Sequence, residues 1–463
     1  MDHTLIFAIA ASGIFLLFAL VKIASCLARR ETVSVKFAKC LTYPYFLGRH
    51  HAIGPWTRCE FLLHLLYVAA NAVLLGVPSP SAPSVSQRAG TLSVVNMVFL
   101  FTGMHPAFYP DLLGITLRTR RGFHRAAGWA VAALSVVHAC SLTDRADFPL
   151  GIPANLWAVI GAISLGGLPL LFIPAFRKFA YEASLRAHQA TACLCVYAIW
   201  SHLPPDWPSD RLYMLYLYVA LRIFAVSWWS WAQSHPFTVV SWSKGKQDAV
   251  ELVIQPRRGL TADLLRLTDT EPGSSFTLPA YVSGPHGVSE SVERYTTVLM
   301  VASGPGIAAM IPYIKRLIHG FNARTCRACR VHFVWQLRTS YTAMVMHEWL
   351  GQLLEEDVSN NSYILSISIY LETEKMLSEK LPFGSHERII VYTGPADLPA
   401  IVQKEVSGQH IQRLPNFEDE RGDTLVMASV SDSLRDRLRT IVHGYLDEKV
   451  RLSELEFQPG RFD

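Results

Sequence analysis

The segment HRAAGWAVAALSVVH, residues 124–138, is an apolar stretch with a histidine at each end. A second segment, HQATACLCVYAIWSH at residues 188–202, has the same length and also begins and ends with histidine. In an α-helix, this separation corresponds to roughly 21 Å along the axis and brings both histidines to nearly the same face. The two histidines of one helix therefore cannot bind the same metal ion. Each can share a centre with its counterpart on the other helix.

The composition indicates a membrane protein, because only 17% of the 463 residues are charged and 51% are hydrophobic. Soluble domains carry about 25% charged residues. A helix needs about 20 apolar residues to cross the hydrocarbon of a bilayer. From about residue 234 onward the composition is that of a soluble protein. The predicted spans lie near residues 4–28, 60–77, 91–108, 123–141, 154–173, 187–203 and 211–231.

The distribution of basic residues predicts the orientation in the membrane. Lys and Arg collect in the loops after the first, third and fifth predicted spans, and cytoplasmic loops are enriched in these residues. We expect an outward N-terminus and a cytosolic C-terminal half, in the plasma membrane. Arg29 and Arg30 follow the first span without a small-residue cleavage site, so this span is expected to remain as an anchor. The net charge of +5 reflects this loop bias and needs no nucleic-acid partner.

Histidines in a bilayer are costly and usually functional. We interpret the isolated His64 and His105 as hydrogen-bonded core residues, whereas the four histidines of the matched segments form two pairs at equal membrane depth. Neighbouring spans offer no carboxylates for a dimetal site. A flat macrocycle held by one imidazole on each face fits, so we predict two bis-histidine haems. The predicted pairs are His124 with His188, near the cytosolic surface, and His138 with His202, near the outer surface.

These histidine pairs resemble those of the ferric reductase and NADPH oxidase family, and the resemblance covers nearly the whole chain from about residue 90 onward. It implies a multi-domain membrane protein that binds two b-type haems, FAD and NADPH. The expected domains are a haem-binding α-helical transmembrane bundle of about seven spans at 1–233, a β-barrel-like FAD-binding domain at 234–295, and an NADPH-binding α/β domain of the ferredoxin-NADP reductase type at 296–463.

Two short motifs resemble the flavin-binding motifs of this family. HPFT follows the last predicted span and leads into a strand, and GPHG resembles the family's GPxG turn, although a surface turn is the alternative interpretation. The segments AVELVIQP and SSFTLPAYVSGPHG are expected to be strands. About sixty residues separate HPFT from the next domain, so the flavin domain is short. The residues assigned to the flavin are His235, Pro236, Phe237, Thr238, Gly284, Pro285, His286 and Gly287.

The segment YTTVLMVASGPGIAAMIPYIKRLI predicts a buried strand, a glycine-rich turn and a helix. Glycines let the main chain approach a pyrophosphate at a helix N-terminus. Strands and helices then alternate, which predicts a doubly wound α/β domain. Arg338 ends the second strand and favours the 2′-phosphate of NADPH over the ribose of NADH, unless it is a solvated arginine. The residues assigned to the pyrophosphate turn are Gly304, Pro305, Gly306 and Ile307.

The sequence departs from the family at the last core strand, where MASVSDS (427–433) replaces a Cys-Gly-Pro turn near the nicotinamide. At the C-terminus, Phe462 is either the counterpart of the family's terminal aromatic residue or part of a frayed tail. The resemblance implies an NADPH-dependent ferric-chelate reductase that carries electrons through FAD and two haems to an external acceptor. The alternatives are a superoxide-producing NADPH oxidase, a pathway-specialised reductase of an organic substrate, and a haem-binding scaffold with a decayed reductase half.

Overall fold

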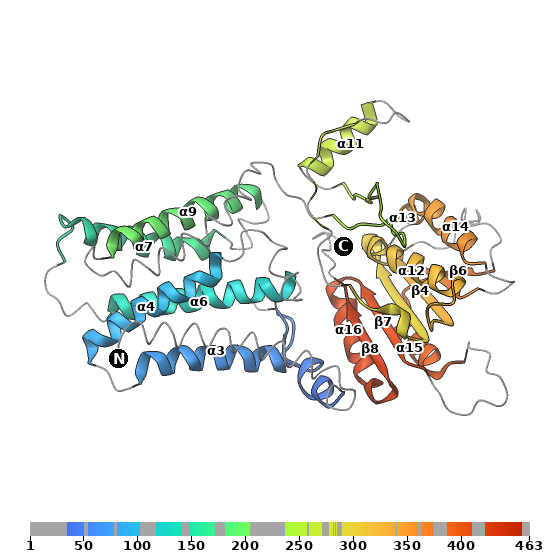
Figure 1. The fold of residues 1–463 in the computed structure, drawn as a ribbon, viewed down its shortest axis with the longest axis horizontal. Helices are drawn as coiled ribbons and strands as arrows, with labels where there is room; N and C mark the ends of the chain where they lie inside the picture. The colour runs from blue at the N-terminus through green and yellow to red at the C-terminus, as the bar shows by residue number, and fades with distance from the viewer. Residues whose placement is uncertain are drawn as a thin grey trace. The chain divides into compact units, whose positions relative to one another are not determined.

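A computed structural model of the chain divides into two compact units (Figure 1). The first comprises Met1–Arg30 and Cys59–Gln233, and the second comprises Glu31–Arg58 and Ser234–Asp463. The sequence predicted a single domain at 1–233, whereas in the structure residues 31–58 group with the second unit. The structure describes residues 35–50, 54–77, 81–101, 117–140, 148–171, 181–203, 237–256, 259–270, 277–280, 282, 284, 289–338, 340–358, 363–373, 387–409 and 422–455.

In its described residues, the first unit consists of helices. They are α3 (Arg58–Gly76), α4 (Ala82–Phe101), α6 (Leu117–Cys140), α7 (Pro153–Leu170) and α9 (Tyr181–His202). Within the part that the structure describes, α3 and α7 are long and apolar enough to cross a membrane. The predicted spans at 4–28 and 211–231 lie outside the described residues. Seven spans therefore remain a prediction.

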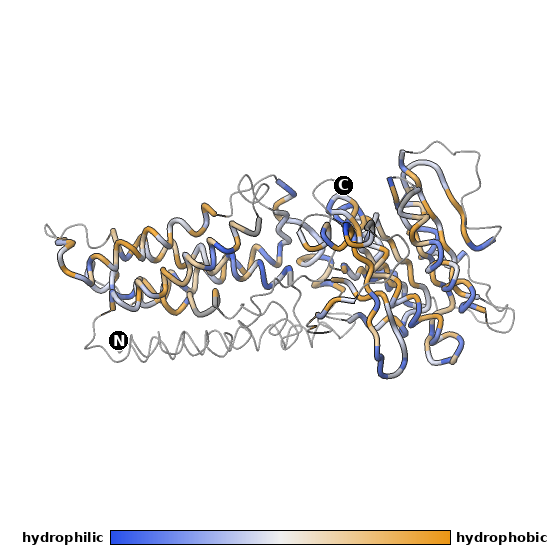
Figure 2. Tube along the Cα trace, turned by 90° about the horizontal axis from the view of Figure 1, so that it is seen from above, coloured by the Kyte–Doolittle hydropathy of each residue, from blue (hydrophilic) through white to orange (hydrophobic). Residues whose placement is uncertain are grey.

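The helices pack as two hairpin-like pairs, α4 with α6 and α7 with α9. Small residues allow α7 and α9 to pack closely, because a Cβ on Gly161 of α7 would lie 3.6 Å from the Ala198 Cβ of α9. Polar bonds join the first pair, with Ser93 and Ser135 hydroxyl oxygens 2.9 Å apart. Both features are typical of helix contacts in membranes. Large apolar side chains remain exposed, as at Ile163 (70%), which suits a lipid surface. Figure 2 shows hydrophobic residues along these helices.

Helix α4 begins earlier than the predicted span at 91–108. Its first residue is Ala82, inside the Pro- and Ser-rich stretch PSPSAPS (78–84), whose composition predicts a short external loop, and residues 102–108 lie outside the described part of the chain. The hydropathy rises only near residue 91, but the polar first turns are stabilised by contacts with α6. Ser86, for example, donates a hydrogen bond to the His138 carbonyl oxygen at 3.1 Å. The loop interpretation was therefore wrong at this end.

The second unit contains a six-stranded parallel sheet in the order β6-β5-β4-β3-β7-β8. Its alternation of strands and helices gives the predicted α/β architecture. The strands are β3 (Thr297–Ser303), β4 (Arg330–Leu337), β5 (Leu365–Leu371), β6 (Ile389–Thr393), β7 (Thr424–Ser429) and β8 (Val450–Glu454). The helices are α12 (Ile311–Asn322), α13 (Tyr341–Val345), α14 (His347–Glu356), α15 (Leu398–Ser407) and α16 (Asp432–His443).

Both faces of the central strands β3, β4, β5 and β7 are buried, which explains the continuous apolar runs of these strands. Along β3, Met300 packs into one apolar cluster with Ile314 of α12, while Leu299 and Val301 pack into a second cluster with Leu438 of α16. Figure 2 shows hydrophobic residues within this sheet. Because strands and helices alternate along the chain, the helices cover the two faces of the sheet. The turns described below lie at the ends of the strands.

The flavin segment is only partly described. Residues 237–256 contain one antiparallel bridge, between Val239 and Leu252, and the Val240 N–H donates to the Glu251 carbonyl oxygen at 2.9 Å. A helix, α11 (Leu260–Thr270), follows. The β-barrel-like domain therefore stays a prediction.

Candidate functional site

The structure brings together the two histidine pairs that the sequence predicted. The ring centroids of His124 in α6 and His188 in α9 are 6.3 Å apart, and those of His138 and His202 are also 6.3 Å apart. A metal ion bound by two imidazoles needs about 2 Å to each ring nitrogen. Facing rings at this separation leave room for one such ion. The residues present therefore fit the axial ligand pairs of two haems.

The hydrogen bonds of the outer pair determine which ring nitrogen can bind a metal. His138 Nδ1 donates to the Ser86 carbonyl oxygen of α4 at 2.8 Å, and His202 Nδ1 donates to the Ala154 carbonyl oxygen of α7 at 3.0 Å. A neutral imidazole that carries its proton on Nδ1 keeps a lone pair on Nε2. Such bonds orient metal-binding histidines in general. Both outer imidazoles are therefore prepared to bind a metal through Nε2.

The inner pair lies beside the same two helices as the outer pair. The main chain of Leu100 in α4 lies beside His124, and that of Leu168 in α7 lies beside His188. Along α4, Leu100 follows Ser86 by the same number of residues that separates His124 from His138. Along α7, Leu168 follows Ala154 by the number that separates His188 from His202. The same two helices, α4 and α7, thus border both histidine pairs. These neighbours leave no mark in the sequence, because every residue carries a main-chain carbonyl.

A glycine also contributes to the outer pair. A Cβ on Gly90 of α4 would lie 3.1 Å from His138 Nδ1, which is closer than ordinary contact. Glycine therefore lets the His138 ring approach α4 and reach the Ser86 carbonyl. The isolated His64 differs, because its Nδ1 donates to the Glu60 carbonyl oxygen at 2.7 Å within α3 itself. That bond agrees with the predicted hydrogen bonding of His64, but the ring is only half-buried, so the residue is not part of a core. His105 lies outside the described residues.

The second candidate site lies where the strand order of the sheet reverses. The chain runs from β3 through β4 and β5 to β6 in one direction, and then places β7 and β8 on the other side of β3. Ligands of doubly wound sheets bind outside the carboxyl ends of the strands at such a switch point. The loops that follow β3 and β7 border this position.

The glycine turn after β3 packs directly on the end of β7. Gly304 has a φ of +49°, which favours glycine, and its carbonyl oxygen accepts a hydrogen bond from Trp335 Nε1 at 2.8 Å. A Cβ on Gly306 would lie 2.0 Å from the Ser429 carbonyl oxygen. Only glycine fits at that position. The turn, Gly304–Ala309, leads through Met310 into α12.

A hydrogen bond joins the two loops at the switch point. The Ser431 N–H, after β7, donates to Ser303 Oγ at 2.8 Å. Pro305 and the buried Ile307 belong to the same turn, and Arg338 follows β4 directly with an exposed side chain. The structure therefore gathers the predicted pyrophosphate residues in one turn and places Arg338 after the neighbouring strand.

The predicted flavin residues are not gathered in the described structure. Phe237 and Thr238 are described, and Gly284 has a φ of +130°, which favours glycine. His235, Pro236, Pro285, His286 and Gly287 lie outside the described residues, as does Phe462. The flavin assignment stays a prediction.

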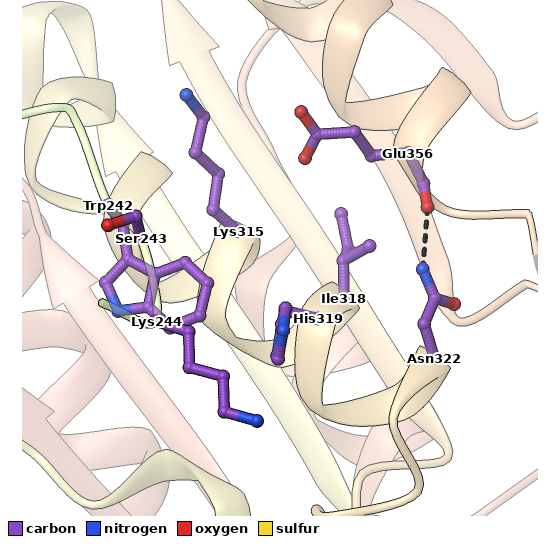
Figure 3. A pocket seen from close by; sticks show the side chains of 8 residues that line it. All are labelled: Trp242, Ser243, Lys244, Lys315, Ile318, His319, Asn322 and Glu356. Carbon is purple, nitrogen blue, oxygen red and sulfur yellow. Dashed lines mark hydrogen bonds between the residues drawn. The ribbon is translucent and has the colours of Figure 1, made fainter. Parts of the chain in front are cut away.

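A pocket of about 400 Å³ lies elsewhere on the second unit (Figure 3). It forms between residues 242–244 and the last turns of α12, where Trp242 and His319 rings lie 5.3 Å apart. Asn322 Nδ2 closes one side by donating to the Glu356 carbonyl oxygen at 2.9 Å. The glycine turn precedes α12, whereas this pocket lies at its C-terminal end, so the pocket contains none of the predicted site residues. Its lining residues are Trp242, Ser243, Lys244, Lys315, Ile318, His319, Asn322 and Glu356.

Three family profiles match successive parts of the chain. The ferric reductase like transmembrane component matches residues 89–199, an FAD-binding domain matches 213–290, and the ferric reductase NAD binding domain matches 295–386. The first match contains His124, His138 and His188 and ends just before His202, and the third contains the glycine turn. The chain belongs to the ferric reductase family and is a membrane protein with a transmembrane domain followed by FAD-binding and NAD-binding domains.

Individual relatives agree with this family. Ferric reductase transmembrane component 3 of Saccharomyces cerevisiae is 22% identical over 60% of this chain and 49% of its own length. Ferric/cupric reductase transmembrane component 2 of the same yeast is 21% identical over 56% of this chain and 46% of its own length. The chain thus spans about half the length of the curated relatives it matches. A flavohemoglobin structure from Malassezia yamatoensis, with bound FAD and heme, covers 80% of this chain and 98% of its own at 12% identity, but its TM-score of 0.24 is too low to show a shared fold.

Proposed function

We propose that the chain carries electrons from cytosolic NADPH across the plasma membrane to an external acceptor, and that chelated ferric iron is this acceptor. The observation that carries the proposal is the pair of equal 6.3 Å histidine contacts between α6 and α9. Two bis-histidine sites at different depths suit electron transfer along the helices. A haem held by one histidine from each helix would have two protein ligands on its iron, which would disfavour oxygen binding there.

Each group of residues has one task in this proposal. His124 and His188 would hold the inner haem, and His138 and His202 the outer haem, with Nδ1 of the outer pair held by main-chain carbonyls. FAD, when bound, accepts the electron pair of a hydride and releases electrons one at a time, as haem iron requires. The HPFT and GPHG motifs, residues 235–238 and 284–287, would bind this flavin.

The NADPH site is proposed at the switch point of the sheet. The turn Gly304–Ala309 offers main-chain N–H groups to the pyrophosphate, and Arg338 would bind the 2′-phosphate. The proposed domains are the transmembrane domain at 1–233, the FAD-binding domain at 234–295 and the NADPH-binding domain at 296–463. The positively charged loops support a cytosolic position for the FAD-binding and NADPH-binding domains.

The decisive experiment measures ferric-chelate reduction and oxygen consumption in the same membranes after NADPH is added. Chelate reduction without matching oxygen consumption supports the proposal. Oxygen consumption that does not depend on the chelate would favour a superoxide-producing oxidase. Haem reduction with neither product would favour an organic acceptor. NADPH that leaves the haems oxidised would contradict the electron path altogether.

A change in the flavin motif tests the path from the other side. The double substitution His235→Ala with Thr238→Ala should leave both haems bound and reducible by dithionite, because neither residue lies on a haem-bearing helix. The same variant should lose haem reduction by NADPH, and added FAD should partly restore it by mass action. Reduction by NADPH at the normal rate would mean that electrons reach the haems by another route.

A further inference from the structure

Residues 35–49 form part of the second unit although they lie near the start of the chain. This segment, called the N-terminal strap below, contains a short π-helix (Ala38–Thr42) and strand β1 (Tyr45–Leu47). Strand β1 pairs with β2 (Trp56–Thr57), and α3 begins at the next residue. The strap packs on α16 and β8, the last helix and the last strand of the sheet domain.

The first half of the strap is held by a combination of apolar and main-chain contacts. Ala38 is buried in the apolar cluster that contains Leu438 of α16. Arg439 of α16 donates to the Thr42 carbonyl oxygen at 2.6 Å and to the Tyr43 carbonyl oxygen at 3.1 Å. These bonds satisfy carbonyls at the end of the short helix. The Tyr43 hydroxyl in turn accepts the Leu452 N–H of β8 at 3.0 Å.

The second half of the strap contacts the first turns of α16. Arg49 Nη1 donates to Asp432 Oδ2 at 2.7 Å, and its Nε donates to Asp436 Oδ2 at 2.8 Å. Tyr45 donates its hydroxyl to Asp436 Oδ1 at 2.7 Å. Like charges four residues apart destabilise a helix. A single guanidinium from the strap thus offsets the repulsion between two carboxylates of α16.

The titration behaviour of these groups agrees with the geometry. Burial raises the pKa of Tyr45, and its hydrogen bond to Asp436 raises it further, to about 12. Burial alone would raise the pKa of Asp436, but the hydrogen bonds from Arg49 and Tyr45 outweigh it and lower this pKa below its usual value. The carboxylate is therefore stabilised in its charged form by the strap.

The contacted end of α16 borders the switch point of the sheet. Only Val430 and Ser431 separate the end of β7 from Asp432, the first residue of α16. Ser431 is the residue whose N–H bonds to Ser303 beside the glycine turn. In this chain the segment Met427–Ser433 contains neither glycine nor proline to restrict its conformation. Its geometry therefore depends on contacts with its neighbours.

We propose that the N-terminal strap positions the loop after β7 for dinucleotide binding, with Arg49 as the principal positioning residue. This inference rests on the proposed function for the identity of the ligand. Arg49 does not touch the ligand position; it acts through the first turn of α16. The strap thus makes a segment that precedes α3 part of the nucleotide-binding unit.

The test compares Arg49→Ala with Lys36→Ala in the full-length protein. Lys36 is an exposed cation of the same strap, so its loss is a matched change in charge. We expect Arg49→Ala to weaken NADP⁺ binding in calorimetry, and to raise the KM for NADPH, roughly fivefold, the size expected from two partly exposed ion pairs. The kcat, the haem content and dithionite reduction should stay unchanged. Arg49→Lys, which can reach one carboxylate, should fall between the two.

Tyr45→Phe is a second variant that keeps the test decisive if Arg49→Ala has a folding defect. It removes only the hydroxyl that bonds to Asp436, and should weaken NADP⁺ binding roughly twofold. NADP⁺ binding by Arg49→Ala as tight as that of Lys36→Ala would overturn the proposal. If Arg49→Ala loses haem, unchanged binding by Tyr45→Phe would overturn it instead. A wild-type protein that binds NADP⁺ without reducing haem would refute the proposed function alone, whereas one that does not bind NADP⁺ would refute both.

Discussion

The helices of the first unit and the sheet of the second position their candidate site residues differently. In α6 and α9, four side chains would carry the proposed chemistry, and a regular helix repeats their spacing. At the switch point, main-chain groups of two loops carry it, and their positions depend on contacts such as Ser431 with Ser303. Cofactor binding at a site made of side chains should be strongly weakened when those side chains are substituted. Ligand binding at a site made of main-chain groups should instead be weakened by changes in the packing around the turn.

The largest expected effect is loss of a whole haem from the helical site. The double substitution His138→Ala with His202→Ala should reduce the haem content from about two to about one per chain, because no other ligand replaces the imidazoles. External ferric reduction should disappear, while NADPH should still reduce the remaining haem. Absorbance spectroscopy measures both. His64→Ala, a helical histidine outside the pairs, is the control and should keep both haems.

A large effect on stability is expected at a buried ion pair beneath the sheet. Glu405 of α15, with a side chain 2% exposed, accepts bonds from Arg330 at 2.6 and 2.7 Å and from His332 at 2.8 Å. Glu405→Gln should lower the free energy of unfolding of the second unit by about 4 kcal/mol, since removal of one partner leaves buried charge uncompensated. Thermal unfolding followed by circular dichroism measures this, with the exposed Glu355→Gln as control.

The same ion pair predicts the direction of a pH dependence. Burial of Glu405 opposes its ionisation, but hydrogen bonds from His332 and Arg330 outweigh this and lower its pKa to about 2. A lowered pKa in the folded state stabilises the protein above the unfolded value of about 4.3. The stabilisation should fall as the pH drops from about 4.5 toward 2. A Glu405→Gln variant should lack this component, and equal acid sensitivity of both proteins would contradict it.

Gly306→Ala tests whether the turn after β3 depends on packing. Its new Cβ would meet the Ser429 carbonyl oxygen, so the loops must separate at a cost of about 3 kcal/mol. NADP⁺ binding should weaken markedly while the haem content stays normal. The control is Gly351→Ala in α14, where nothing lies within 4 Å of the new Cβ. Alanine favours a helix, so that variant should be slightly more stable. Equal NADP⁺ binding by the two variants would argue against the proposed pyrophosphate turn.

Arg338→Ala is expected to have a smaller effect than Gly306→Ala, and a more selective one. Loss of one charge-assisted contact to a phosphate is worth about 2 kcal/mol, so the KM for NADPH should rise by more than roughly tenfold. The KM for NADH, which lacks the 2′-phosphate, should change little. Steady-state kinetics with both nucleotides measures the ratio. Equal increases for both would assign Arg338 a structural role and leave nucleotide selection to other residues.

The sequence predicted those features that follow from local periodicity. Equal spacing paired His124 with His188 and His138 with His202, and buried apolar runs predicted β3, β4, β5, β6 and β7. The strand, glycine turn and helix around Gly304 were visible because a positive φ and a close approach both demand glycine. Strand β8 and helix α15 were missed, since Val450–Glu454 and Leu398–Ser407 carry charged residues among their apolar positions.

By itself, the sequence determined the membrane and α/β character of the two halves and the pairing of the four histidines, because hydropathy and helical spacing act over neighbouring turns of chain. Only the tertiary structure revealed the carbonyls of Ser86 and Ala154 beside the outer histidines and the attachment of Arg49 to Asp436. A carbonyl has no sequence signature, and an ion pair across several hundred residues leaves no periodic pattern. Such contacts arise when folding brings distant segments together.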